Sequence, residues 1–362
     1  MQGVLVDERV RVGGDAKQQF HDSRAYGRVI NGTEIELSPT EAAHLLARGD
    51  IDAIVQPDST TTLGLRGFLQ KTGITLQFGV YKDLRDRGFY LSPAAVAWPG
   101  VDVSTADSDI DFVVFPRGSG PDDGSIAYRI RVASERDSLQ LRRLSDTVTA
   151  VVDEDGEITY FEAVTGLPET ESKDTAAHTG SSSDLSLSAT PLTAALQSDR
   201  VICDPGDGQL YQKYFFGQRL FGRNANEGPL QLSLLEGLYL ATRGAITVDP
   251  ADIRDRGRSI EAADEMFTRR YAVYHYLRSH DIVPKSGYKF GADFRIYPDF
   301  SDVSSLEHSA ALIRVHSPET TLSPRELSLD VRLAGGVRKR MSFALTEVNG
   351  DIDWLTVARL TP

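Results

Sequence analysis

Cysteine is almost absent from this chain of 362 residues, since Cys203 is the only one. A single cysteine can form neither an internal disulfide nor a thiolate metal cluster, so both are excluded. Long apolar runs are also missing, because no stretch approaches the roughly 18 consecutive apolar residues of a membrane helix. The N-terminus, MQGVLVDERV, lacks the basic and apolar regions of a signal peptide. We therefore expect a cytoplasmic protein with no membrane partner.

Lysine is scarce as well, because only 8 of the 39 basic residues are lysine, and 52 acidic residues give a net charge of −13. Proteins that bind RNA usually carry a basic field, so this charge excludes recognition by simple long-range attraction. An acidic surface poor in lysine suits very high salt, where attraction to phosphate is weakened. We interpret the composition as halophilic, although an ordinary acidic cytoplasmic protein would share it.

The chain contains an internal repeat, which indicates a tandem duplication. At an offset of 195 the first half matches the second at Tyr26-Gly27-Arg28 with Phe221-Gly222-Arg223, Leu37-Ser38 with Leu232-Ser233, Glu41 with Glu236, and Arg48-Gly49 with Arg243-Gly244. Further along, with small shifts, Phe78, Val80, Tyr81, Leu84 and Arg85 match Tyr271, Val273, Tyr274, Leu277 and Arg278. DIDFVVFPRG (109–118) then matches ADFRIYPDF, SIAYRIRV (125–132) matches HSAALIRV, and VVDEDGEITYFEAV (151–164) matches LTEVNGDIDWLTVA.

Three strand-like runs from Ser286 onward each carry one reactive side chain: SGYKFGADFRIYPDF, SSLEHSAALIRVH and LDVRLAGGVRKRMSFALTEV. The side chains are Tyr297, His308 and Lys339. A phenol, an imidazole and an ammonium form a metal-free set that can remove a proton, donate one and stabilise developing charge. Taken singly, each has a simpler interpretation: a core tyrosine, a structural histidine and a solvated lysine.

Together, GADFRIY, the following HS and the VRKR that enters the last run resemble the archaeal tRNA-splicing endonuclease family in its two-copy form. The resemblance implies excision of introns from precursor tRNA at bulge-helix-bulge sites, without metal or cofactor. In that reaction the 2′-hydroxyl attacks the adjacent phosphorus and leaves a 2′,3′-cyclic phosphate and a 5′-hydroxyl. Tyr297 would remove the 2′-proton or only orient it, His308 would protonate the leaving oxygen, and Lys339 would stabilise the phosphorane. Because a phenol has a pKa of about 10, Tyr297 would need help from Lys339 and Arg338.

The resemblance and the repeat together predict an α/β fold with mixed α+β sheets. We expect a tandem duplication of a two-domain unit, each unit having a small α/β N-terminal domain and a nuclease-like domain with a mixed sheet flanked by helices. The expected segments are 1–65 and 66–165 for the first copy, a flexible linker rich in Ser, Thr, Ala and acid at 166–196, and 197–255 and 256–362 for the second copy.

The repeat also predicts which copy works. Phe115 stands opposite Tyr297, Ser125 opposite His308 and Ser145 opposite Lys339. The first copy thus keeps the strand pattern without its proton-transfer groups, and we expect it to be structural.

The resemblance suggests further contacts with the RNA and with a second chain. Arg332 matches a residue that grips a bulged base, and Trp354 stands where the family usually has a second arginine; an indole also stacks on bases, although Trp354 could be a core or edge residue. The acidic turn Asp153, Glu154, Asp155, Gly156 and Glu157 matches a loop that docks into the catalytic unit of a partner chain, which predicts a homodimer. It could equally be a solvated turn.

Two other functions remain open at this stage. Asp293, Glu307 and Lys339 could form the site of a metal-dependent nuclease, since acidic pairs with a lysine occur in such enzymes. Alternatively, the chain could be a non-catalytic RNA-binding or assembly subunit, as the first copy alone would be.

Overall fold

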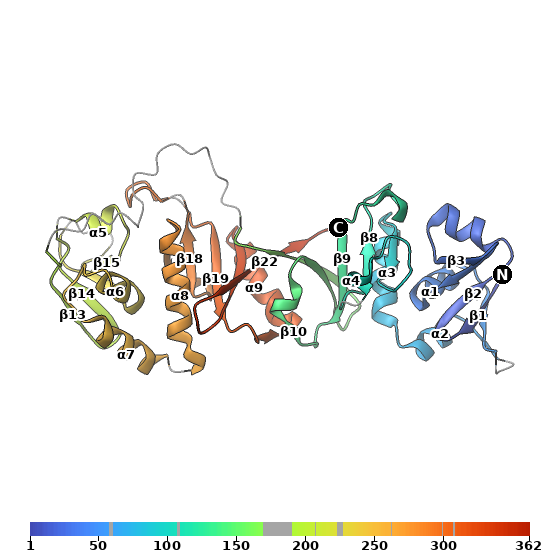
Figure 1. Cartoon of the computed structure of the whole chain (residues 1–362), viewed down its shortest axis with the longest axis horizontal. Helices are drawn as coiled ribbons and strands as arrows, with labels where there is room; N and C mark the ends of the chain where they lie inside the picture. Colours follow the sequence, from blue (N-terminus) through green and yellow to red (C-terminus); the bar gives the residue numbers. More distant parts are fainter. Residues whose placement is uncertain are drawn as a thin grey trace.

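The computed structural model describes residues 1–57, 61–106, 109–168, 190–206, 208–222, 227–261, 263–298, 300–306 and 308–362. The molecule is elongated, with a small N-terminal domain at each end and one long sheet between them (Figure 1). The C-terminus lies near the middle, where Arg117 donates to the carbonyl of Pro362 at 3.3 Å. Within the described residues, none of the helices is both long and apolar enough to cross a membrane.

The first small domain is a six-stranded sheet with a helix that follows its fourth strand. The strand order is β3-β4-β2-β1-β5-β6, with bounds Arg28–Asn31, Glu34–Leu37, Arg9–Val12, Gln2–Val6, Ala53–Val55 and Thr62–Leu63. Helix α1 (Pro39–Arg48) begins with a capping box between Ser38 and Glu41. It ends at Gly49, whose φ of 77° is the left-handed conformation that glycine adopts without strain.

The second small domain repeats this design at the other end of the molecule. Its sheet has the order β13-β14-β16-β15, with bounds Ala194–Leu196, Arg200–Cys203, Leu230–Ser233 and Gln218–Arg219. Helix α6 (Leu234–Ala241) again begins with a capping box, between Ser233 and Glu236. The repeat at Ser38 and Glu41 is therefore confirmed, although α6 ends three residues before Gly244.

One part of the predicted repeat is wrong. The N–H of Gly27 donates to Glu41 Oε1 at 2.6 Å, and the residue that does the same for Glu236 is Gly217, at 2.9 Å, rather than Gly222. The counterpart of buried Tyr26 is therefore Phe216, which is 0% exposed, whereas Phe221 is 74% exposed. Between this glycine and its glutamate the second copy has five more residues than the first, so Phe221 and Gly222 resemble the first copy only in sequence.

A mixed sheet of ten strands joins the two nuclease-like units. Its order is β17-β18-β19-β21-β22-β12-β11-β9-β8-β7, with bounds Val283–Ser286, Phe294–Tyr297, Ala311–His316, Arg340–Thr346, Ile352–Leu360, Ile158–Thr165, Thr147–Val152, Tyr128–Ser134, Phe112–Val114 and Leu91–Pro93. The two parallel pairs are β9 with β11 and β19 with β21. Each unit contributes five strands in the same order, which confirms the tandem fold.

The units meet where β12 pairs with β22 in an antiparallel register. In this pair Ala163 lies opposite Val357, its own counterpart 194 positions later. The two hairpins have the same register at this offset: Val151 pairs with Thr159 in the first unit, and Leu345 pairs with Asp353 in the second. The register therefore places an approximate two-fold axis at Ala163 and Val357, with one unit on each side.

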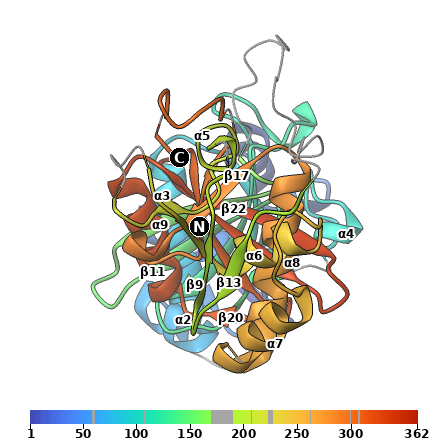
Figure 2. The same cartoon turned by 90° about the vertical axis from the view of Figure 1, so that its left-hand side faces the viewer.

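Two helices cover opposite faces of the second unit, as the end-on view shows (Figure 2). Helix α8 (Met266–Ser279) packs with Ile296 and Ile313 in one core, and α9 (Pro324–Gly336) packs with Leu312 and Met341 in another. Because side chains alternate along a strand, β19 contributes to both cores. The first unit has helix α3 (Thr75–Asp86) where the second has α8, and only a 3₁₀ turn at Leu141–Leu144 where the second has α9.

Helix α9 corrects the strand-like interpretation of LDVRLAGG. A capping box between Ser323 and Glu326, with Pro324 in the first turn, begins this helix, and the strand starts only at Arg340. The segment predicted as a linker is described at its two ends only. Gly166 donates to the carbonyl of Trp354, and residues 194–196 form β13, which pairs with β14; residues 169–189 lie outside the described part of the chain.

Candidate active site

The sheet register brings Tyr297, His308 and Lys339 to one edge of the second unit. Tyr297 is the last residue of β18, which runs antiparallel to β19. His308 precedes the start of β19, and Lys339 precedes the first residue of β21, Arg340, which pairs with the first residue of β19. The end of β18 and the starts of β19 and β21 thus meet at the same edge of the sheet.

A sharp turn between α9 and β21 positions Lys339. Arg338 takes a φ of 56°, in the left-handed region, and the N–H of Lys339 donates to the carbonyl of Ala334 at 2.9 Å. The Lys339 ammonium donates to the carbonyl of Ser309, the residue after His308. This contact fixes the lysine to the segment that carries the histidine.

The charge around Lys339 is positive. Partial burial and then the nearby charges of Arg295 and Lys289 lower the pKa of the Lys339 ammonium below its ordinary value. Cations that repel one another in this way gain from an anion placed between them. A phosphate is such an anion.

Tyr297 is buried against an aromatic side chain, whereas His308 is exposed. The Tyr297 side chain is 8% exposed, and its ring lies edge-on to Phe215 at a centroid distance of 5.9 Å. His308 is exposed in the segment before β19. An exposed imidazole at this edge is accessible to a leaving group that approaches from solvent.

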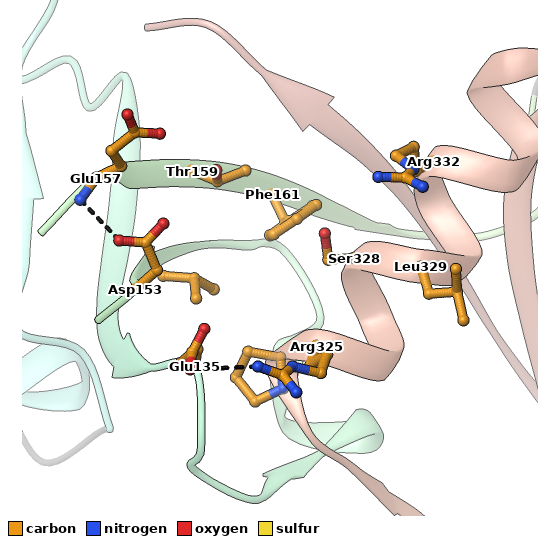
Figure 3. A pocket seen from close by; sticks show the side chains of 11 residues that line it. Glu135, Asp153, Glu157, Thr159, Phe161, Arg325, Ser328, Leu329 and Arg332 are labelled. Carbon is orange, nitrogen blue, oxygen red and sulfur yellow. Dashed lines mark hydrogen bonds and ion pairs between the residues drawn. The ribbon is translucent and has the colours of Figure 1, made fainter. Parts of the chain in front are cut away.

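Arg332 lines a groove of about 450 Å³ between α9 and the hairpin of β11 and β12 (Figure 3). The groove also contains Arg325 from α9, and Asp153 and Glu157 from the acidic turn of the first unit. The side chain of Arg332 is exposed. It is therefore accessible from solvent, and it shares the groove with these carboxylates.

Trp354 lies on the other face of the sheet. It is 8% exposed and packs against Tyr276 of α8, with ring centroids 5.5 Å apart. Its counterpart 194 positions earlier is Tyr160, which is also buried. The structure thus corrects the predicted role, because an indole packed in the core presents no face on which a base could stack.

The acidic turn has the predicted hairpin form. Asp153 Oδ1 accepts from the N–H groups of Asp155 and Glu157 at 3.0 and 2.9 Å, and Gly156 takes a φ of 81°. Glu154 forms an ion pair with Arg136 of its own unit. The tip residues Asp155 and Gly156 are exposed. Asp153 therefore shapes the turn, and the carboxylate at the tip remains available for an external contact.

The alternative metal site is not assembled in the described residues. Asp293 lies before β18, at the end of that strand away from Tyr297, and its carboxylate accepts from the N–H of Val315 at 2.9 Å and pairs with Arg270 at 3.2 Å. Asp111 bonds the N–H of Val132 in the same way in the first unit, which identifies this aspartate as structural. Glu307 lies outside the described residues. Elsewhere in them, no cluster of His, Cys, Asp and Glu fits a metal ion.

The register confirms which residues of the first unit correspond to the reactive three. Phe112 pairs with Ile130 as Phe294 pairs with Ile313, which places Phe115 at the position of Tyr297. Ile130 pairs with Val148 as Ile313 pairs with Ser342, which places Ser145 at the position of Lys339. Ser125 stands three residues before β9, as His308 stands three residues before β19. The first unit therefore has the same edge without the reactive groups.

Comparison with known proteins decides the family. The family model described as "tRNA intron endonuclease, catalytic C-terminal domain" matches residues 267–354, and the one described as "tRNA intron endonuclease, N-terminal domain" matches residues 1–65 and again 192–256. The chain belongs to the tRNA intron endonuclease family. The catalytic match covers Tyr297, His308 and Lys339.

Relatives of the same length support this assignment. Proteins named tRNA-splicing endonuclease from Haloferax volcanii and Natronomonas pharaonis are 54% and 46% identical to this chain over 100% of both chains, and one from Methanosarcina barkeri is 32% identical over 99% of both. The first two come from haloarchaea, in agreement with the acidic composition. The chain is thus an enzyme of the tRNA intron endonuclease family.

Two features of the site were missed by the sequence analysis. Arg295 lies two residues before Tyr297, with its guanidinium 5.9 Å from the centre of the tyrosine ring. Lys285, on β17, forms a buried ion pair with Glu236 of the small domain at 2.6 Å. In the first unit, Trp98 takes this place and donates to Glu41 at 3.1 Å. For Arg295 a signal was present, because the aligned repeats place Val113 opposite it.

Proposed function

We propose that the chain excises introns from precursor tRNA by a transesterification that needs no metal, at the edge formed by Tyr297, His308 and Lys339. The observation that carries this proposal is the meeting of a phenol, an imidazole and an ammonium at one sheet edge, within the residues that match the family's catalytic domain. The same edge of the first unit, which has Phe115, Ser125 and Ser145, acts as a scaffold.

Each residue has a role that follows from its position. Tyr297, held against Phe215, receives or orients the 2′-proton. Lys339 stabilises the charge that develops on the non-bridging oxygens of the phosphorane. His308, exposed and adjacent to Ser309, donates a proton to the leaving 5′-oxygen. The products are a 2′,3′-cyclic phosphate and a 5′-hydroxyl.

The substrate feature is a bulge-helix-bulge, with Arg332 gripping a bulged nucleotide from the groove beside α9. A matched pair of RNAs tests this specificity: an intron-bearing precursor tRNA, and the same RNA with compensating changes that pair both bulges. We expect the first to give exons and a linear intron and the second to remain intact. Equal cleavage of both RNAs would contradict recognition by shape.

The active enzyme is a homodimer in which the acidic turn of one chain docks beside the catalytic unit of the other. Because Asp153 shapes its own turn, the test should leave this residue in place. We expect Asp155→Ser with Glu157→Gln to weaken the dimer and reduce cleavage, since removing carboxylates from a pocket of cations leaves those cations unpaired. Light scattering measures the dimer and circular dichroism checks the fold.

The second unit supplies the control for this experiment, because its own turn holds Asp351. Asp351→Ser changes an acidic turn at the equivalent hairpin and should leave both dimer and cleavage unchanged. A double variant at Asp155 and Glu157 that stays dimeric and fully active would show that the turn is only a solvated one.

A further inference from the structure

Arg295 lies close to two of the proposed catalytic groups. It pairs with Leu312 of β19, which belongs to the core under α9, whereas the ring of Tyr297, two residues later, packs on Phe215 in the core that includes α8. The guanidinium of Arg295 nevertheless lies 5.9 Å from the centre of the Tyr297 ring, and its charge acts on Lys339. Arg295, Tyr297 and Lys339 are therefore neighbours at this edge of the sheet.

The charge of Arg295 is not neutralised within the described part of the chain. Neighbouring cations are neutralised by carboxylates. Lys285 pairs with Glu236 at 2.6 Å, Arg270 pairs with Glu261 and with Asp293, and Arg314 pairs with Asp330 at 2.8 Å. Arg295 has no acidic partner there, and its buried Nε has no hydrogen-bond acceptor. Because a buried polar group without a partner costs free energy, the Arg295 guanidinium would gain from an anion placed beside it.

Space for that anion lies beside the guanidinium. A cavity of about 450 Å³ opens between the sheet and the second small domain, lined by the cations of Arg295, Lys285, Arg200 and Arg270 and by the carboxylates of Glu236 and Asp199. The ring of Tyr297, 5.9 Å from the guanidinium carbon, holds the arginine by a cation–π contact. The guanidinium fork is therefore positioned before any ligand arrives.

The repeat shows that the fold does not need this arginine. Residues that serve the structure are kept in both units, such as Asp293 with Asp111 and Arg314 with Arg131. Val113, which is fully buried, stands at the position of Arg295. Arg295 thus follows the pattern of Tyr297, His308 and Lys339, whose counterparts in the first unit have lost the functional group.

We propose that Arg295 binds a non-bridging oxygen of an RNA phosphate next to the scissile one, and so positions the strand across Tyr297 and Lys339. A guanidinium suits this task because its parallel N–H groups match two phosphate oxygens. The inference rests on the proposed function, since it assumes that the RNA crosses this edge. It adds a substrate-binding residue to the proposed reaction.

Binding to modified RNA tests the contact without requiring cleavage. The probe is a precursor tRNA with a 2′-deoxy nucleotide at the cleavage site, made either with all phosphates charged or with one neutral methylphosphonate at the first or second phosphate on either side. We expect Arg295→Gln to weaken binding of the fully charged RNA about 10-fold, the value of one charge-assisted hydrogen-bond contact. The same substitution should have no effect on the RNA in which the contacted phosphate is neutral.

Two further variants keep the result interpretable. Arg295→Val copies the residue that the first unit has at this position, so it should fold and behave like Arg295→Gln. Arg129→Gln removes one exposed arginine from the first unit and should weaken binding of all the RNAs equally or not at all. If Arg295→Gln weakens binding of every methylphosphonate RNA by the same factor as the charged one, the proposed contact is wrong.

Cleavage of the unmodified RNA by the unaltered chain is measured in parallel. Failure of that cleavage would overturn the proposed function, whereas cleavage without coupling between Arg295 and any phosphate would overturn only this inference.

Discussion

His308→Ala is expected to slow single-turnover cleavage of a precursor tRNA by roughly 10²–10⁴-fold, the usual contribution of general acid catalysis. RNA binding should change little, because the side chain is exposed at the edge of the sheet. The measurement is the rate at saturating enzyme, with the dissociation constant determined separately. A leaving group with a lower pKa than the natural 5′-oxygen should restore much of the rate, since it needs no proton.

The control for this variant is His280→Ala. His280 is also exposed, and its ring stacks on Tyr276 of α8 at a centroid distance of 4.1 Å. Its removal should leave the rate within about twofold of the parent. Cleavage by His308→Ala at the parent rate would contradict the assignment of the general acid.

Lys285→Met should destabilise the second copy by about 3–5 kcal/mol, because it leaves the buried carboxylate of Glu236 without its cation. The ammonium contacts Glu236 at 2.6 Å and also donates to the carbonyls of Phe215 and Gly217 at 3.2 and 3.0 Å. Burial by itself would raise the pKa of Glu236, but Lys285 and the N–H groups of Ser233 and Gly217 outweigh it and lower the pKa. Denaturant unfolding in high salt measures the loss.

The pH dependence of stability should reverse in this variant. In the parent, the lowered pKa of Glu236 gives stability that is present above the ordinary carboxyl pKa and lost as the pH falls through the lowered one. Without Lys285, Glu236 resembles buried Glu41, whose pKa is raised by burial. Its contribution is then present at low pH and lost as the pH rises through the raised pKa.

The double variant Lys285→Met with Glu236→Gln is the control, since a neutral amide carries no buried charge and its one oxygen still accepts from the N–H of either Ser233 or Gly217. It should recover part of the stability and lose the pH dependence of this site. A single variant as stable as the parent would show that the pair contributes nothing beyond the burial of its carbon atoms.

Local sequence patterns predicted the parts of the fold that local chemistry determines. The capping residues Ser38 and Glu41 recur as Ser233 and Glu236, because each pair satisfies the first N–H groups of its own helix. The reactive edge was predictable for a different reason. Tyr297, His308 and Lys339 each adjoin a strand end, and a sheet brings strand ends together.

What the sequence could not show depends on contacts between distant segments. Lys285 and Glu236 are 49 residues apart, in different domains, and no local pattern relates them. The Phe-Gly-Arg at 221–223 matched Tyr26-Gly27-Arg28 closely in sequence, yet burial selects Phe216 as the counterpart of Tyr26. The burial of Trp354 could not be predicted either, because the ring that packs against it, Tyr276, comes from α8 and is distant in sequence.

Analysis of the fragment ends formed in excess EDTA tests the central claim most directly. A precursor tRNA is incubated with the full chain in EDTA, and the ends are examined before and after mild acid. If Tyr297, His308 and Lys339 perform the reaction, cleavage continues in EDTA, the 5′ ends accept phosphate from a kinase without prior phosphatase treatment, and the 3′ ends become phosphatase-sensitive only after acid opens a cyclic phosphate. Cleavage that stops in EDTA and returns with magnesium, or that leaves 5′-phosphate and 3′-hydroxyl ends, would contradict it.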